Sequence, residues 1–117
     1  GHQALAEFFR GRLRRIEHPF HGHDSPIRLT EPDEPFWKGV PNDAVVGRYH
    51  SWVVEDTDLP DCLIPTAWSD DDGVLMAMRH KLLPHYGVQF HPESIISDCG
   101  ERLIRNWLDI ATQIRKT

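Results

Sequence analysis

Hydrophobic residues recur with a helical spacing at both ends of the 117-residue chain. Residues 2–9 (HQALAEFF) carry apolar side chains at positions i, i+1, i+4 and i+5, which predicts a short helix that Gly11 can end. Asp98 is a candidate N-cap with Glu101 in the capping-box position, and the pattern after it predicts about four turns of amphipathic helix. The apolar face of that helix comprises Leu103, Ile104, Trp107, Leu108, Ala111 and Ile114.

Between these helices the pattern favours β-strands. Residues 44–55 (AVVGRYHSWVVE) are rich in β-branched and aromatic residues, with a break near residues 47–51. Residues 62–69 (CLIPTAWS) and 74–80 (VLMAMRH) flank the acidic sequence DDDG and predict a hairpin, in whose turn Asp-Gly supplies the positive φ angles. Residues 86–90 (YGVQF) predict a short buried strand.

The remaining segments are less regular. Residues 12–17 (RLRRIE) and 26–30 (PIRLT) are strand-like pieces on either side of a histidine-rich loop. Residues 31–43 (EPDEPFWKGVPND) contain three prolines and a glycine, which predicts a loop or a single turn of helix. At this length the chain can hold one small domain, but not two.

The composition is that of an ordinary globular protein, with 39% hydrophobic residues and a mean hydropathy of −0.49. No apolar run approaches the roughly 20 residues of a membrane helix, and the net charge of −5 argues against binding to nucleic acid or membranes. Cys62 and Cys99 form neither a disulfide framework nor a metal motif, so we expect a reducing, cytoplasmic location and no cofactor. One local basic cluster is interpreted as a solvated surface: Arg10, Arg12, Arg14 and Arg15.

Eight histidines prompt a search for a metal site, and three of them lie in the sequence EHPFHGHDS, residues 17–25. His21 and His23, with Asp24, have the spacing of a zinc site on a strand, because residues i and i+2 share one face. The proline and glycine between the histidines favour an irregular loop instead. A zinc site is therefore kept only as an alternative for this loop.

The sequence HPES, residues 91–94, places two titratable side chains after a predicted strand. Open α/β sheets build their sites at strand ends. Pro92 fixes its own φ and biases His91 toward an extended backbone, so His91 and Glu93 can lie on one side. The carboxylate would then orient the imidazole, which is the base half of a nucleophilic triad. A His-Pro-Glu tripeptide alone is more often a solvated surface pair.

Three motifs together resemble the class I glutamine amidotransferases, whose Cys-His-Glu triad hydrolyses glutamine and releases ammonia. GVQFHPES, residues 87–94, followed by an amphipathic helix, is similar to the C-terminal signature of that family. GHQALAEFF, residues 1–9, resembles the segment just after the family's nucleophile. RYHSW, residues 48–52, resembles a motif that helps to hold glutamine. The motifs follow the family's order and span nearly the whole chain.

The resemblance implies an α/β fold: part of the family's mixed sheet flanked by helices, with the first half, including the nucleophile strand, absent. Residues 1–117 would then be a partial domain that runs from after the nucleophile cysteine to the C-terminal helix. The general base would be His91, and Glu93 would orient it. The glutamine substrate would be bound by Gln3 and, through backbone groups, by Ser51 and Trp52. The Trp52 side chain itself is expected to pack within its strand.

The forms of the three motifs look most like the glutaminase components of anthranilate synthase and aminodeoxychorismate synthase. This resemblance implies that ammonia passes to a chorismate-binding synthase, present as a subunit or a fused domain. The nucleophile would lie two positions before Gly1, so the chain alone would be inactive. Neither Cys62 nor Cys99 matches its context. Arg10 also departs from the family pattern, in which a glycine pair more usually ends this helix.

Two alternatives to a glutaminase stay open. The first is a catalytically silent docking module that only contacts the synthase, and a cysteine two positions before Gly1 would exclude it. The second is a related γ-glutamyl peptidase, which shares the triad but releases other amines. Copurification with a chorismate-binding chain would argue against the second alternative.

Overall fold

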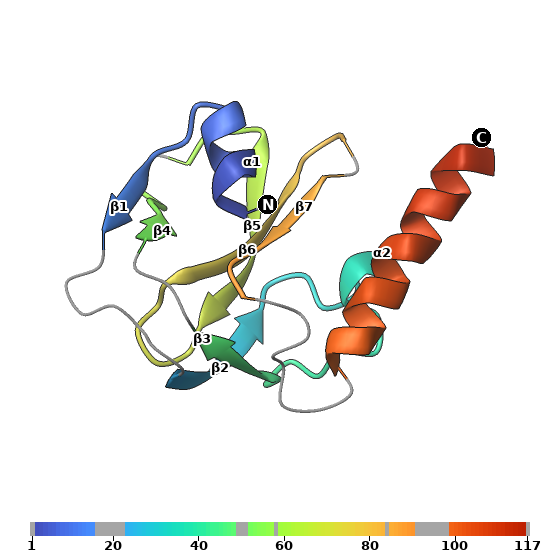
Figure 1. Cartoon of the computed structure of the whole chain (residues 1–117), viewed down its shortest axis with the longest axis horizontal. Helices are drawn as coiled ribbons and strands as arrows, with labels where there is room; N and C mark the ends of the chain where they lie inside the picture. Colours follow the sequence, from blue (N-terminus) through green and yellow to red (C-terminus); the bar gives the residue numbers. More distant parts are fainter. Residues whose placement is uncertain are drawn as a thin grey trace.

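The computed structural model describes residues 2–15, 23–48, 52–57, 59–83, 85–90 and 99–116. Within these ranges it contains two α-helices, one 3₁₀ helix and seven strands (Figure 1). In chain order they are α1 (His2–Phe8), β1 (Leu13–Arg15), β2 (His23–Leu29), η1 (Pro35–Trp37), β3 (Val45–Arg48), β4 (Trp52–Val54), β5 (Leu63–Ser69), β6 (Leu75–His80), β7 (Tyr86–Val88) and α2 (Cys99–Lys116). The helices that the sequence predicts at both ends are confirmed, and so is the turn of helix in residues 31–43.

Five of the strands form an antiparallel sheet in the order β3-β2-β5-β6-β7, and β1 pairs with β4 in a separate two-stranded ribbon. The predicted hairpin of β5 and β6 is confirmed. Its turn differs from the expectation, because Gly73 has a φ of +70° while Asp72 has no positive φ. The loop is closed by the Gly73 N–H, which donates to the Ser69 carbonyl at 2.9 Å. Glycine alone therefore supplies the left-handed conformation.

Two hydrophobic clusters hold these elements together. The larger one packs η1 and α2 against the sheet and is centred on the fully buried Trp37, Ile27 and Met76. The smaller one packs α1 and the β1–β4 ribbon against β5 and β6 through Ala6 and Met78. No helix in the described ranges combines the length and the apolar content that a membrane crossing requires.

A buried asparagine fixes α2 against η1. The Asn106 side-chain amide donates hydrogen bonds to the carbonyls of Phe36 at 2.9 Å and Lys38 at 2.8 Å. Asn106 is 4% exposed, and Leu103, one turn earlier, is buried beside it. A buried amide is stable only when its donors are satisfied, so these two bonds set the rotation of α2 about its own axis.

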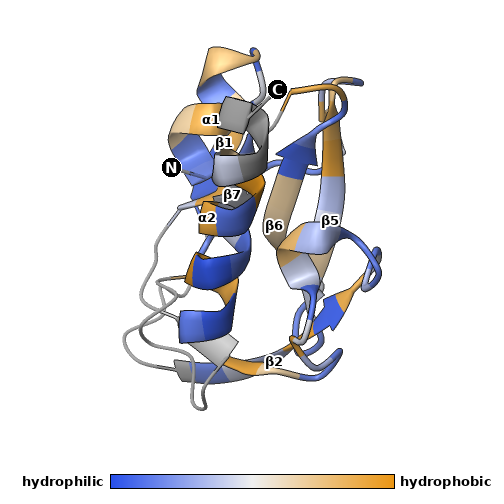
Figure 2. Cartoon of the chain, turned by 90° about the vertical axis from the view of Figure 1, so that its right-hand side faces the viewer, coloured by the Kyte–Doolittle hydropathy of each residue, from blue (hydrophilic) through white to orange (hydrophobic). Residues whose placement is uncertain are grey.

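That rotation leaves much of the predicted apolar face of α2 uncovered. Of the apolar residues whose side chains are described, only Leu103 is buried, while Trp107 is 47% exposed and Ile104 and Leu108 are similarly open. Figure 2 looks onto α2 and shows apolar segments at intervals along an otherwise hydrophilic helix. The helix is amphipathic as predicted, but the part of its apolar face formed by Ile104, Trp107 and Leu108 is turned away from the core that Asn106 faces.

Helix α1 shows the same discrepancy. Its buried residues are His2 and Ala6, while Phe8, from the predicted apolar stripe, is 79% exposed. Phe8 and Trp107 line one open hollow of about 470 Å³ beside β7. The predicted short strand is confirmed over Tyr86–Val88, but its burial is partial, because Tyr86 and Val88 are half-buried. This part of the molecule is apolar but incompletely covered.

The close packing of α1 on β7 depends on Gly87. A Cβ atom at this position would lie 3.0 Å from the His2 Cα and 3.3 Å from both the His2 Nδ1 and a Leu5 methyl group. A contact of 3.0 Å is tighter than most carbon contacts, and a backbone atom cannot rotate away as a side chain can, so α1 would have to shift slightly. Glycine therefore avoids a tight contact where helix and strand cross.

We predict that Gly87→Ala destabilises the complete protein by about 1–3 kcal/mol, because α1 must shift away from β7. Urea unfolding measures the change. Gly73→Ala is the comparison, since its new Cβ would meet nothing within 4 Å and only the positive φ would add a cost. An equal loss of unfolding free energy in Gly87→Ala and Gly73→Ala would contradict the proposal that the close approach of α1 causes the destabilisation.

Candidate functional site

Of the five residues that the sequence predicts for the site, the structure describes Gln3 and Trp52. His91, Glu93 and Ser51 lie outside the described residues, so their predicted roles stay predictions. The Gln3 amide Nε2 donates a hydrogen bond to the Trp52 carbonyl at 3.3 Å. This bond joins the GHQ and RYHSW motifs, which are 49 positions apart in the chain.

The third motif begins at the same place. Gly87, the first residue of GVQFHPES, lies under His2, the residue next to Gln3. The described parts of all three motifs therefore meet around the first turn of α1. Sequence order alone does not require this, because β4 and β7 belong to different sheets and α1 is the element that contacts both.

The backbone and the side chain of Trp52 have different surroundings. Its carbonyl oxygen accepts the Gln3 hydrogen bond, while the expected contact of its backbone with glutamine stays a prediction. Its side chain is 46% exposed, so the expectation that the indole packs within the strand is wrong. The reason is that β4 is a short strand in a two-stranded ribbon, and in that ribbon Trp52 is paired only with Arg15.

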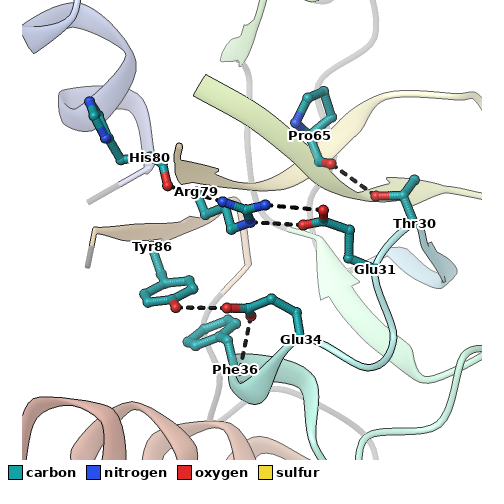
Figure 3. Close-up of polar contacts among 8 residues, drawn as sticks. All are labelled: Thr30, Glu31, Glu34, Phe36, Pro65, Arg79, His80 and Tyr86. Atoms are coloured by element: carbon teal, nitrogen blue, oxygen red, sulfur yellow. Dashed lines mark hydrogen bonds and ion pairs between the residues drawn. The ribbon is translucent and has the colours of Figure 1, made fainter. Parts of the chain in front are cut away.

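A polar network fixes β7 from its other side (Figure 3). The Tyr86 hydroxyl donates to Glu34 at 2.8 Å, and the Tyr86 ring stacks on Phe36 with 4.6 Å between ring centroids. The other oxygen of Glu34 accepts the Phe36 N–H at 2.9 Å. Burial, and then the hydrogen bond to Glu34, raise the pKa of Tyr86, so it stays a neutral donor. The strand that leads to residue 91 is thus held to η1.

The adjacent strand β6 is fixed by an ion pair. The Arg79 guanidinium donates two hydrogen bonds to the Glu31 carboxylate, at 2.8 and 3.1 Å. These bonds, together with the charge of Arg79, lower the pKa of Glu31 against the opposing effect of burial. This network is not predicted from the sequence. Glu31 and Arg79 are 48 positions apart, and a bidentate geometry leaves no local pattern in the sequence.

Comparison with known proteins identifies the family. The model of the family described as "Glutamine amidotransferase class-I" matches residues 1–111 of the chain. The chain belongs to this family. The resemblance inferred from the three motifs is therefore confirmed, and so is the predicted α/β fold class.

The relatives in this family include components of anthranilate synthase and aminodeoxychorismate synthase. A Haemophilus influenzae protein provisionally named anthranilate synthase component II is 49% identical over 110 residues, covering 94% of this chain and 56% of the relative. Aminodeoxychorismate synthase component 2 of Escherichia coli is 45% identical over 108 residues, covering 92% of this chain and 56% of the relative. The chain thus spans about half the length of these two curated relatives.

A solved structure supports the fold directly. A Thermoplasma acidophilum protein, provisionally named as part of a GMP synthase, superimposes with a TM-score of 0.85 at 26% identity. The match covers 99% of this chain and 56% of that protein. The described elements are therefore arranged as in a class I amidotransferase, although the chain accounts for only part of such a protein.

The remaining candidates are the histidines of the possible zinc site and the two cysteines. In the described part of the chain, no group of three or more His, Cys, Asp or Glu side chains lies close enough to hold a metal ion. The zinc alternative falls on His21, which is not described, and on His23, whose backbone alone is described at the start of β2. Cys62 is a half-buried free thiol, and Cys99 begins α2.

We predict that Glu31→Gln makes the complete protein less stable by up to about 1 kcal/mol near neutral pH, because the ion pair with Arg79 is lost. A lowered carboxyl pKa stabilises the folded state above the unfolded pKa, near 4.5, and this contribution disappears as the pH falls through the folded value. The variant should therefore lose less stability than the wild type on acidification. Urea unfolding on both sides of pH 4.5 measures the difference.

Glu101→Gln is the matched control. Glu101 also accepts a 2.8 Å hydrogen bond from an arginine, but both partners are more than two-thirds exposed, so little stability should change. If the stability of the two variants changes with pH in the same way, the Glu31–Arg79 ion pair does not contribute more to stability than an exposed pair.

Proposed function

We propose that the complete protein hydrolyses glutamine to glutamate and ammonia, and that the ammonia aminates chorismate on a synthase subunit or fused domain. The observation that carries this proposal is the meeting of the three family motifs at the first turn of α1, through the Gln3–Trp52 bond and the Gly87 contact. The names of the two curated relatives support the choice of chorismate as the partner's substrate. A separate synthase chain and a fused domain both fit the proposal.

The proposed chemistry is acyl transfer through a thioester. A cysteine thiolate, expected two positions before Gly1, attacks the amide carbon of glutamine after its proton passes to His91. His91 then gives that proton to the leaving amine, which departs as ammonia. Water, deprotonated by His91, releases glutamate and restores the thiol. Glu93 would orient the imidazole and stabilise its charged form.

Gln3 is proposed to contribute to substrate binding. Its amide reaches the Trp52 carbonyl, next to Ser51 in the RYHSW motif. A side chain tied to that backbone at one end of the motif would keep the Ser51–Trp52 peptide groups in place for the glutamine. This is a positioning role that the described geometry supports, whereas direct contact with glutamine is carried over from the family resemblance.

We predict that His91→Ala in the complete protein lowers glutaminase turnover by at least about 100-fold, because the general base and acid are lost together. Ammonia release from glutamine measures the turnover. His85→Ala is the matched control, since His85 is exposed and follows the β6 strand outside the proposed triad. Near-normal turnover in His91→Ala would refute the assignment. A complete protein without turnover would favour the silent docking module.

We further propose that residues 1–117 form only part of a glutamine amidotransferase domain. The exposed apolar residues of both helices support this, because Phe8 and Trp107 face a common hollow beside β7, the end strand of the described sheet. A second hollow of about 170 Å³, lined by Val88, Leu103 and Ile104 among others, adjoins it. Apolar surface of this kind is normally covered in a finished domain. The greater length of the relatives supports the same conclusion.

We predict that the 117-residue chain produced alone has no measurable glutaminase activity and binds a hydrophobic dye such as ANS strongly. The complete protein should bind the dye weakly. Coexpression with the rest of the domain should restore activity and suppress dye binding together. An isolated chain that turns over glutamine would contradict the partial-domain proposal.

A further inference from the structure

The β1–β4 ribbon carries a basic surface on a chain whose net charge is −5. Figure 1 places the ribbon beyond α1, on the side away from α2. Four arginines in and just before β1 are all exposed: Arg10, Arg12, Arg14 and Arg15. The ribbon is therefore spatially separate from the open apolar surface between α1, β7 and α2.

Two of these arginines have no acidic partner among the residues that the structure describes. Arg14 forms an ion pair with Glu55 at 3.2 Å, and the Glu55 carboxylate neutralises part of the positive charge of this surface. For Arg10 and Arg15, no carboxylate of the described residues lies within ion-pair distance. Among the described residues, their guanidinium groups therefore face solvent rather than a countercharge.

Arg10 is also the least expected residue for its backbone position. The N–H groups of Gly11 and Arg10 donate to the carbonyls of Ala6 at 2.7 Å and Glu7 at 3.0 Å, which closes α1 in a Schellman arrangement. Arg10 adopts a φ of +68° there, a conformation that favours glycine. Glycine at this position would end the helix without the steric cost of a positive φ. Strained residues of this kind are often found at functional sites.

Arg15 lies directly opposite Trp52 in the β1–β4 ladder. The indole of Trp52 is half exposed while its carbonyl is held by Gln3, so its side chain is available at the surface without disturbing that bond. An exposed aromatic ring opposite an exposed arginine is a combination typical of the anchoring residues of protein interfaces.

We propose that this surface, defined by Arg10, Arg15 and Trp52, docks an acidic segment of the synthase partner. The charge pattern favours such an occupant, because a carboxylate-rich segment is attracted by the arginines of the ribbon and repelled by the net negative charge of the chain. A membrane or nucleic acid fits less well, since both need a large basic surface and the net charge is negative. This inference rests on the proposed function, which supplies the partner.

The experiment measures binding between the complete protein and a purified chorismate-binding synthase subunit from the same organism. Arg15→Glu should raise Kd by about tenfold or more at low salt, and by less in about 0.5 M NaCl, where screening weakens charge pairs. Arg28→Glu is the matched control. Arg28 is an exposed strand arginine opposite a tryptophan, Trp68, but it lies in the main sheet and its Kd should not change.

Arg10→Gly separates docking from folding. Glycine relieves the positive φ, so the melting temperature of the complete protein should rise by roughly 2 °C or more, while Kd for the synthase increases several-fold. A variant that is more stable yet binds more weakly cannot owe its defect to misfolding. Basal glutaminase turnover should be unchanged in Arg10→Gly, Arg15→Glu and Arg28→Glu.

The outcomes distinguish the two proposals. Equal Kd values for Arg15→Glu and Arg28→Glu, or a wild-type protein that turns over glutamine but binds no synthase subunit, overturn the docking surface and leave the glutaminase standing. A wild-type protein that binds the synthase through Arg15 but hydrolyses no glutamine overturns the glutaminase and leaves the docking surface intact.

Discussion

The packing of α1 against β7 at Gly87 is the constraint on which the other contacts around the candidate site depend. A Cβ atom on residue 87 would lie 3.0 Å from the His2 Cα, which is tighter than most carbon contacts, so glycine lets the two elements approach without displacement. This approach fixes the first turn of α1 in the smaller hydrophobic cluster and points Gln3 at the Trp52 carbonyl. A shift of α1 by the width of a methyl group would lengthen the Gln3 bond beyond hydrogen-bond range, since it is already 3.3 Å. The absence of a side chain at Gly87 thus affects the geometry of the contact between the GHQ and RYHSW motifs.

The network on the other side of β7 complements this packing. Tyr86 precedes Gly87, and its hydroxyl and ring are held by Glu34 and Phe36. Because neighbouring residues of a strand point to opposite faces, glycine can face α1 while Tyr86 turns toward η1. The strand is therefore fixed on both faces just before residue 91. Such two-sided support is what a catalytic side chain needs, because errors well below one ångström affect proton transfer.

The elements themselves could largely be predicted from sequence, because hydrophobic spacing encodes them locally. The hairpin of β5 and β6 and both helices follow from patterns of fewer than twenty residues. The direction in which a helix faces is different, since it depends on distant partners. A hydrophobic pattern does not identify Asn106 as buried, because its side chain is polar. Its hydrogen bonds to the carbonyls of Phe36 and Lys38 nevertheless decide which side of α2 is buried. The same limit applies to the site: motif resemblance could find Gln3 and Trp52, but not the bond between them.

The apolar hollow beside β7 and the basic surface of the β1–β4 ribbon differ in chemistry. This difference affects how each would bind another part of an assembly. The hollow between Phe8, Tyr86 and Trp107 is apolar, so its burial is driven by the hydrophobic effect and would be permanent in a finished domain. The β1–β4 ribbon instead exposes guanidinium groups, whose pairing is screened by salt and can be reversed. A proposed domain completed through the first surface could therefore exchange partners through the second. Because α1 lies between them and carries Gln3, both surfaces adjoin the element on which the three motifs meet.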